Sequence, residues 1–230
     1  MTASPLPQGE QKTAHVRAMF DAIAPRYEMV NRVMTFGLDK RWRRRAVSDL
    51  RLASASAVLD VAAGTGDFAR ELRRQGQRAV ATDLSFNMLR TATGVEARVQ
   101  ADASRLPFRW GAFDGVTCGY ALRNFTDLEK TFSEMARVLR PGGRLSLLEV
   151  AEPSGGPWRA GFRFWFRRCV PFIGSLLSDR DAYHYLPAST AYLPDGAEIV
   201  AMLNRAGFSG VNRRRVMGGL SQQFLATRAA

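Results

Sequence analysis

A short apolar strand that runs straight into a glycine-rich turn constrains the fold of this chain more than any other feature. Residues 58–61 read Val-Leu-Asp-Val, which is typical of a buried strand, and the turn after them contains Gly64 and Gly66. A helical pattern follows over residues 68–74. Glycine lets the backbone turn sharply there and lets a ligand approach the main chain closely. The segment predicts a strand–turn–helix unit with a ligand-binding turn.

Acidic residues around the turn indicate which ligand it suits. The glycine spacing also fits the looser dinucleotide-binding pattern, but Asp60 ends the strand and Asp67 follows the turn, and two carboxylates there would repel a pyrophosphate. Asp60 can instead bind a cation such as the amino group of S-adenosylmethionine. Asp83 ends the next apolar run, where an acid accepts hydrogen bonds from a ribose diol. The acids predict an adenosyl site, although a helix N-cap or a turn uses the same residue type.

Length and composition predict one globular domain. The chain has 230 residues, 46% of them hydrophobic, which is enough for a sizeable core. We expect a disordered, polar N-terminus over residues 1–15 and a single domain over residues 16–230. No apolar run is long enough to cross a bilayer, and Cys118 and Cys169 match no metal-binding spacing. A cytoplasmic protein without a bound metal is therefore expected.

The formal net charge of +12 has two interpretations. It is typical of chains that bind nucleic acid or anionic lipid, but nearly all the basic residues are arginine, which equally indicates a compositional bias. Residues 162–168 read Phe-Arg-Phe-Trp-Phe-Arg-Arg. On a helix they would lie at a membrane surface, with arginines on lipid phosphates, or would pack on the core as an amphipathic lid. Peripheral contact with the inner face of the cell membrane is one expectation.

Apolar runs and helical patterns alternate along most of the chain. Strands are predicted at residues 58–61, 78–82, 97–100, 114–119 and 144–150, and helices at residues 68–74, 87–93, 128–139 and 195–206. Residues 211–216 and 221–227 are predicted to pair as a hairpin. The pattern predicts an α/β fold with a Rossmann-like sheet, mostly parallel with a C-terminal antiparallel hairpin, and the hairpin separates the methyltransferase pattern from a second dinucleotide-binding half. Ligands bind at the carboxyl ends of such strands, where Asp102 and Gly119 also fall.

Two segments lie outside this alternation. Residues 16–47 are helical in pattern, with interruptions expected near Pro25 and Gly37, and form N-terminal helices. Residues 152–193 are too long for a simple connection and are rich in aromatic and basic residues, so a lid or substrate insert is expected there.

Four blocks of the sequence are distinctive in their order. They are Phe-Asp-Ala-Ile-Ala-Pro-Arg-Tyr at 20–27 with Asn31, Gly37 and Arg-Trp-Arg-Arg at 41–44; Ala-Leu-Arg-Asn-Phe-Thr-Asp at 121–127; Arg-Pro-Gly-Gly through Leu-Glu at 140–149; and Tyr-Leu-Pro-Ala-Ser at 185–189. Together they resemble a class I S-adenosylmethionine-dependent methyltransferase, and more closely the ubiquinone/menaquinone biosynthesis C-methyltransferase family. Ala121 stands where that family usually has glycine, and residues 150–153 also depart from its pattern. These departures bear on the substrate more than on the cofactor.

The resemblance implies methylation of a ring carbon on a polyprenylated quinol, with S-adenosylmethionine as methyl donor and no metal. Demethylmenaquinol is favoured over the ubiquinone-pathway benzoquinol as the substrate. The implied cofactor residues are Asp60, Gly64, Thr65 and Gly66 at the loop, Asp83 on the ribose, Asp102 and Ala103 on the adenine, and Gly119 at the methionine end.

Three residues are candidates for catalysis. Arg123 can stabilise a developing phenolate or order a water that takes the proton, or else form a structural ion pair with an acid such as Asp127. Asn124 can orient the same water or cap a helix. His184 can serve as a general base or pack among its aromatic neighbours. A fourth residue, Tyr27, can close over the cofactor or belong to the core.

Other functions remain open from the sequence. The charge and the aromatic residues fit an RNA or small-molecule methyltransferase on the same fold, but the chain lacks the Asn-Pro-Pro-Tyr type of motif and any recognisable RNA module, so no nucleic-acid partner is expected. A protein that binds the cofactor without turnover is a further alternative, against which Arg123 and Asn124 argue. A nicotinamide dehydrogenase is disfavoured by the acids at the glycine loop.

Overall fold

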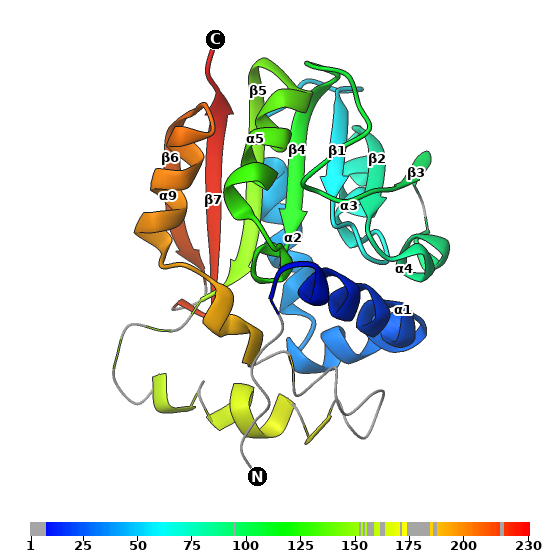
Figure 1. Ribbon diagram of the computed structural model, residues 1–230, viewed down its shortest axis with the longest axis vertical. Coiled ribbons are helices and arrows are strands. Elements are labelled where there is room, and N and C mark those ends of the chain that lie inside the picture. Colours follow the sequence, from blue (N-terminus) through cyan, green and yellow to red (C-terminus); the bar gives the residue numbers. More distant parts are fainter. Residues whose placement is uncertain are drawn as a thin grey trace.

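The computed structural model describes residues 8–93, 95–151, 153, 155, 159–161, 164–170, 172–173, 185, 188–216 and 219–230. Within these residues one sheet has the strand order β3-β2-β1-β4-β5-β7-β6 (Figure 1). Its strands are β1 (Ala57–Val61), β2 (Arg78–Asp83), β3 (Ala97–Gln100), β4 (Phe113–Gly119), β5 (Leu139–Val150), β6 (Phe208–Val216) and β7 (Ser221–Arg228). Neighbouring strands from β3 to β5 are parallel, whereas β7 is antiparallel to β5 and to β6. The predicted fold class is confirmed.

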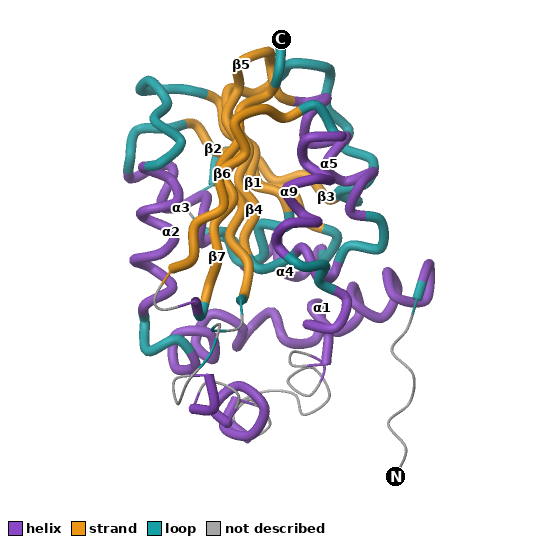
Figure 2. The backbone as a smooth tube through the Cα atoms, turned by 90° about the vertical axis from the view of Figure 1, so that its left-hand side faces the viewer, coloured by secondary structure: helices purple, strands orange, loops and turns teal. Residues whose placement is uncertain are grey.

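Helices cover both faces of the sheet. They are α1 (Gly9–Met34), α2 (Leu38–Ser48), α3 (Asp67–Arg74), α4 (Phe86–Thr91), α5 (Leu128–Val138) and α9 (Gly196–Arg205). Helices α2 and α3 lie on one face and α5 and α9 on the other (Figure 2). Helix α1 crosses the end of the sheet at which the parallel strands finish (Figure 1). The sequence determines where α5 begins, because the Asp127 carboxylate accepts from the N–H of Lys130 at 2.9 Å and caps the helix.

Two apolar clusters hold these layers together. The cluster on the α5 and α9 side contains Val116, Phe132 and Leu145, and the one on the α2 and α3 side contains Leu50 and Leu72, all of them essentially without solvent exposure. Burial of each such side chain stabilises the fold by about 1.5–3 kcal/mol. The clusters hold the strand ends rigidly, which is what a ligand site there requires.

Three expectations about the chain outside the sheet need correction. Helix α1 begins at Gly9, so the expected disorder over residues 1–15 is wrong for residues 9–15, and residues 1–7 lie outside the described part. The expected interruption at Pro25 is also wrong, because α1 runs through it without a break. The break at Gly37 is confirmed: its φ of 71° is in the left-handed region that glycine adopts without strain. Strand β5 starts at Leu139, before the predicted start at residue 144, and includes the Pro-Gly-Gly stretch at 141–143.

The described part of the 152–193 insert lies against the α1–α2 corner. The indole N–H of Trp165 donates to the carbonyl oxygen of Met34 at 3.3 Å, and its ring lies 5.0 Å from that of Phe36. Val170 belongs to a small apolar cluster with α1 residues such as Val30. None of the described helices is both long enough and apolar enough to span a membrane. That the whole of residues 152–193 forms a substrate insert stays a prediction.

Candidate active site

The predicted strand–turn–helix unit is present and forms the centre of the site. Strand β1 ends at Val61, and α3 begins at Asp67 after a turn in which Gly64 and Gly66 have φ values of 56° and 83°. The N–H of Gly64 donates to Asp83 Oδ2 at 2.8 Å, which ties the turn to the end of β2. A side chain at either glycine would be strained by these dihedral angles.

A cavity of about 450 Å³ lies at the carboxyl ends of the parallel strands. Five of the eight predicted cofactor residues line it, namely Gly64, Asp83, Asp102, Ala103 and Gly119. The other three do not. The volume falls in the range of small-molecule sites, so the strand ends enclose a space of the size that a nucleoside ligand needs.

Asp60 and Asp83 are the acids that the sequence singles out, and burial affects both. Asp60 Oδ1 accepts from the Thr117 hydroxyl at 2.9 Å, whereas Oδ2 has no hydrogen-bond partner among the described residues. Burial raises the pKa of Asp60 to about 7 and that of Asp83 to about 6. Of these two acids only Asp83 lines the cavity, so its carboxylate can accept directly from a ligand there, whereas Asp60 lies behind the cavity wall.

The remaining predicted cofactor residues divide by position. Gly119 ends β4 and lines the cavity, and a Cβ there would lie 2.5 Å from the buried Phe68 ring, so glycine is the residue that fits at this strand end. Asp102 accepts from the N–H of Ser104 at 2.8 Å and so also serves as a turn residue. Thr65 and Gly66 belong to the loop but do not face the cavity. A Cβ on Gly66 would instead contact the Ala92 side chain at 3.3 Å.

Helix α1 closes the cavity, and Tyr27 is the one residue of it that the sequence interpretation placed over the cofactor. Gly9, Thr13, Val16 and Phe20 also line the cavity. Val16, Phe20 and Tyr27 repeat at helical spacing inside the expected helix, a signal that could have marked this face as a cavity wall. The helix is fastened at its first turns, since Lys12 Nζ donates to the carbonyl oxygen of Phe125 at 2.7 Å and lies 3.8 Å from the Tyr192 ring centroid.

A second cavity, of about 380 Å³, adjoins the first, and Tyr27 and Tyr120 line both. Its wall is mostly apolar, with Met34, Leu38, Trp42, Val150, Trp165, Val170 and Leu220 among the lining residues. Charged side chains also reach it, namely Asp39, Arg43 and Arg123. An apolar molecule with a few polar groups would fit this space.

Arg123, the first catalytic candidate, is 4% exposed and held at several points. Nη1 donates to Glu149 Oε1 at 2.5 Å and to the Tyr120 carbonyl oxygen at 2.9 Å, and Nε donates to the Ser189 hydroxyl at 3.2 Å. The alternative of a structural ion pair is therefore also present, but the acid is Glu149 and not Asp127, which caps α5. Nη2 has no partner in the described part of the chain. The guanidinium is therefore held in place in the wall of the second cavity.

The other catalytic candidates fall differently. Asn124 lines the first cavity, and its buried Oδ1 has no partner within the described chain. Its alternative role as a helix cap is not seen, since α5 is capped by Asp127. His184 lies outside the described residues. Tyr27 stands between the two cavities, where it would separate their ligands.

Comparisons of the sequence and of the fold with known proteins identify methyltransferases as the relatives of this chain. The model of the ubiE/COQ5 methyltransferase family matches residues 8–228. Demethylmenaquinone methyltransferase from Thermus thermophilus is 46% identical over 202 residues, which cover 83% of this chain and 91% of the relative. Ubiquinone/menaquinone biosynthesis C-methyltransferase UbiE from Syntrophotalea carbinolica is 41% identical over 214 residues, which cover 89% and 90%. The solved structure of phosphoethanolamine N-methyltransferase 2 from Haemonchus contortus, in complex with S-adenosyl-L-methionine, aligns with a TM-score of 0.62 at 15% identity, over 83% of this chain and 53% of that one. This chain belongs to the ubiE/COQ5 methyltransferase family and is an S-adenosylmethionine-dependent methyltransferase.

Proposed function

We propose that this enzyme methylates a ring carbon of demethylmenaquinol, a prenylated naphthoquinol, in menaquinone biosynthesis. The observation that carries the proposal is the apolar cavity that adjoins the cofactor cavity and contains the fixed guanidinium of Arg123. The apolar wall suits a fused ring and the start of a prenyl chain, and the arginine suits a phenolic oxygen. The names of the relatives support the naphthoquinol over the benzoquinol.

The residues around the two cavities would divide the work. Asp60 would attract the amino group of S-adenosylmethionine from behind the cavity wall, and Asp83 would accept hydrogen bonds from the ribose. Asp102 and Ala103 would hold the adenine. When bound, this cofactor supplies an electrophilic methyl group. Arg123 would stabilise the phenolate that forms when a hydroxyl proton leaves to a water held by Asn124. The apolar wall keeps bulk water from the reacting carbon.

The assay that tests this function is methyl transfer from labelled S-adenosylmethionine to chemically reduced demethylmenaquinone. The ubiquinone-pathway benzoquinol and tRNA serve as parallel substrates. Methylation of the naphthoquinol alone, at its ring carbon, is the expected result. Preferred methylation of the benzoquinol or of tRNA would contradict the proposed substrate.

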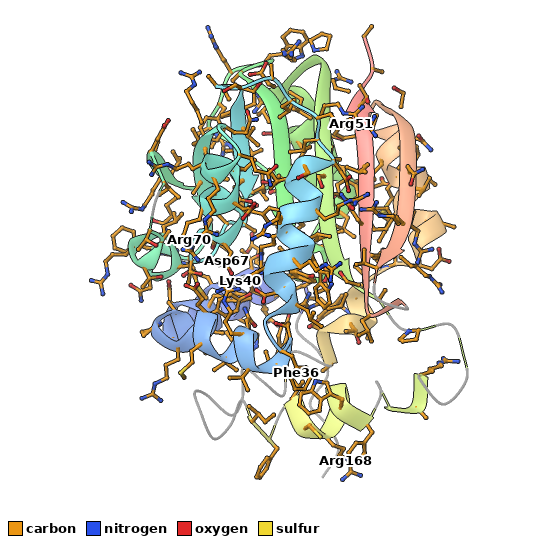
Figure 3. The ribbon with its side chains drawn as sticks, turned by 180° about the vertical axis from the view of Figure 1, so that it is seen from behind. Phe36, Lys40, Arg51, Asp67, Arg70 and Arg168 are labelled. Carbon is orange, nitrogen blue, oxygen red and sulfur yellow. The ribbon has the colours of Figure 1, made fainter. Side chains whose placement is uncertain are left out.

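We also propose that the mouth of the second cavity rests on an anionic membrane. Large apolar side chains are exposed on the segments that supply its wall. Met29 and Val33 on α1, Phe36 after it, and Phe164 and Phe172 in the insert are between 44% and 73% exposed, and we call them the apolar rim. Phe36 lines the cavity as well. Arg168 lies at the same end of the molecule as Phe36 (Figure 3). Exposed rings beside arginine suit the headgroup layer, and a substrate with a long prenyl tail would reach the cavity from there.

Co-sedimentation with phosphatidylglycerol vesicles tests the membrane proposal. The wild type is expected to bind at low salt and to bind neutral vesicles less. Changing Phe36, Phe164 and Phe172 to serine should lower the bound fraction strongly. Phe86→Ser is the matched control, because Phe86 is 55% exposed but lies outside the rim. Equal binding by the triple variant and the wild type would refute the proposal.

The two buried acids predict a pH dependence of cofactor binding. Burial raises the pKa of Asp60 to about 7 and of Asp83 to about 6, and the carboxylate form is the one that attracts the ligand. Affinity for S-adenosylmethionine should therefore fall as the pH drops from 7.5 to 5.5, by up to about tenfold per pH unit for each carboxylate protonated. Calorimetry across this range measures it. Asp60→Asn should remove the dependence near pH 7, and an unchanged profile in that variant would refute the assignment.

The Lys12 contact predicts a role for α1 in holding the cofactor. Lys12→Met removes the hydrogen bond to Phe125 and loosens the first turns of α1 over the cavity. The loss of one hydrogen bond from a cation should weaken S-adenosylmethionine binding by about tenfold. Calorimetry at pH 7 gives the dissociation constants. Lys40→Met is the control, because Lys40 is exposed and lines neither cavity; equal affinities in both variants would contradict the prediction.

A further inference from the structure

A second guanidinium reaches the substrate cavity, and the proposed function does not use it. Arg43 lies on α2 with its side chain 9% exposed. Its Nη1 donates to Asp39 Oδ2 at 2.5 Å and lies 3.4 Å from Asp67 Oδ2. The guanidinium carbon is 5.5 Å from the centroid of the Tyr120 ring. Both arginines therefore contact Tyr120: Arg43 lies over its ring, and Arg123 donates to its carbonyl oxygen.

The donors of Arg43 are only partly used within the described chain. Nη1 serves the two carboxylates, whereas Nε and Nη2 have no hydrogen-bond partner among the described residues. A guanidinium group presents several N–H donors in a fixed plane. Because Arg43 lines the apolar cavity, a ligand oxygen there can satisfy them.

Several other polar groups around this cavity are already engaged. The Thr35 hydroxyl hydrogen-bonds to the Asn31 carbonyl oxygen and to Asp39 Oδ1, and the Tyr120 hydroxyl pairs with that of Ser221 at 3.2 Å. The phenol of Tyr27 is hydrogen-bonded to the Asn31 side chain. Within the described chain, the wall of this cavity also contains the indole N–H of Trp42, which is buried and has no partner among the described residues. A guanidinium binds a phenolic oxygen more strongly than this neutral donor does, because its hydrogen bonds are charge-assisted.

A quinol carries two oxygens para to each other, and the proposed mechanism gives only one of them a partner. The oxygen beside the reacting carbon belongs to Arg123, and its para oxygen would otherwise be buried against apolar side chains. We propose that Arg43 binds this second oxygen and thereby selects a 1,4-dihydroxy ring and fixes its orientation in the cavity. This inference rests on the proposed function and assigns Arg43 as a substrate-binding residue.

A paired comparison of substrates and variants tests the assignment. One substrate is the prenylated naphthoquinol, and the other is an analogue that keeps the hydroxyl beside the reacting carbon and lacks the para hydroxyl. The measured quantity is the ratio of kcat/KM for the two substrates, which is independent of the folded fraction of each preparation. A hydrogen bond from a buried cation predicts that this ratio falls by about ten- to a hundredfold from wild type to Arg43→Gln.

Two further variants make the outcome decisive. Arg32→Gln is the matched control, because Arg32 also pairs with Asp39 but does not line the cavity, and its ratio should equal that of the wild type. Arg43→Lys keeps a cation for Asp39 and serves if the glutamine variant fails to fold; its ratio should also fall. A wild-type ratio in a folded Arg43 variant overturns the inference. Absence of turnover of both substrates by the wild type would instead overturn the proposed function.

Discussion

Replacing Arg123 with glutamine is expected to lower the rate of quinol methylation by about 10²–10³-fold while leaving the affinity for S-adenosylmethionine nearly unchanged. The guanidinium lies in the wall of the substrate cavity and not in that of the cofactor cavity, so its loss should affect the chemical step. Glutamine keeps polar atoms of similar reach but cannot hold a positive charge beside the developing phenolate. Single-turnover methyl transfer measures the rate, and calorimetry measures the affinity.

Glu149 provides a second variant in the same argument. Its carboxylate is fully buried and accepts from Arg123 Nη1, and no described atom donates to Oε2. Glu149 acts as a positioning residue, because it does not line either cavity and its carboxylate holds the guanidinium of Arg123. Glu149→Gln should lower kcat more than it changes KM, since Arg123 loses its orientation but keeps its charge.

The control for these variants is Arg137→Gln, which removes an arginine on α5 that pairs with Glu134 and lines neither cavity. Its rate should match that of the wild type. A normal rate in Arg123→Gln would contradict the catalytic role and leave Arg123 as the structural half of an ion pair. Reduced cofactor affinity in that variant would instead place its effect in the first cavity.

Local pattern predicted the parts of this site that are local in sequence. The turn with Gly64 and Gly66 follows its strand directly, and Asp83 ends the neighbouring strand, so parallel pairing alone brings them together. The hydrogen-bond partner of Asp60 could not be predicted from the sequence. Asp60 alternates with its neighbours along the strand, and the side chain points beneath the loop toward Thr117 on β4, a partner that the sequence does not mark.

Long-range pairing accounts for what the sequence interpretation did not reach. The partner of Arg123 is Glu149, 26 positions away in the sequence. Asp127 is much nearer in the sequence, but its carboxylate caps α5. The substrate cavity is built from α1, α2, the end of β4 and the insert, so its composition depends on tertiary packing. Pro25 was expected to break a helix, but tertiary contacts along α1 outweigh the missing hydrogen bond.

Removing the carboxylate of Asp39 is expected to destabilise the protein more than removing any exposed charge. The side chain is 2% exposed, and Oδ2 accepts from both Arg32 and Arg43 at 2.5 Å, while Oδ1 accepts from the Thr35 hydroxyl at 2.9 Å. This carboxylate thus joins α1 to α2, and through Arg43 it reaches Asp67 at the start of α3. Removing one member of a buried ion pair leaves the other charge without a counterion in a medium that solvates it poorly.

Asp39→Asn should therefore lower the free energy of unfolding by about 3 kcal/mol, which corresponds to a fall in Tm of roughly 6–12 °C for a chain of this size. Thermal unfolding followed by circular dichroism measures it. Asp49→Asn is the matched control, because Asp49 pairs with the exposed side chains of Arg45 and Arg214, and such pairs contribute less than about 1 kcal/mol. Similar Tm values for the two variants would show that the three helices are held by their apolar contacts and not by Asp39. A large fall in Tm for Asp39→Asn alone would show that the ion pairs of Asp39, which also orient Arg43, stabilise the helices around the second cavity.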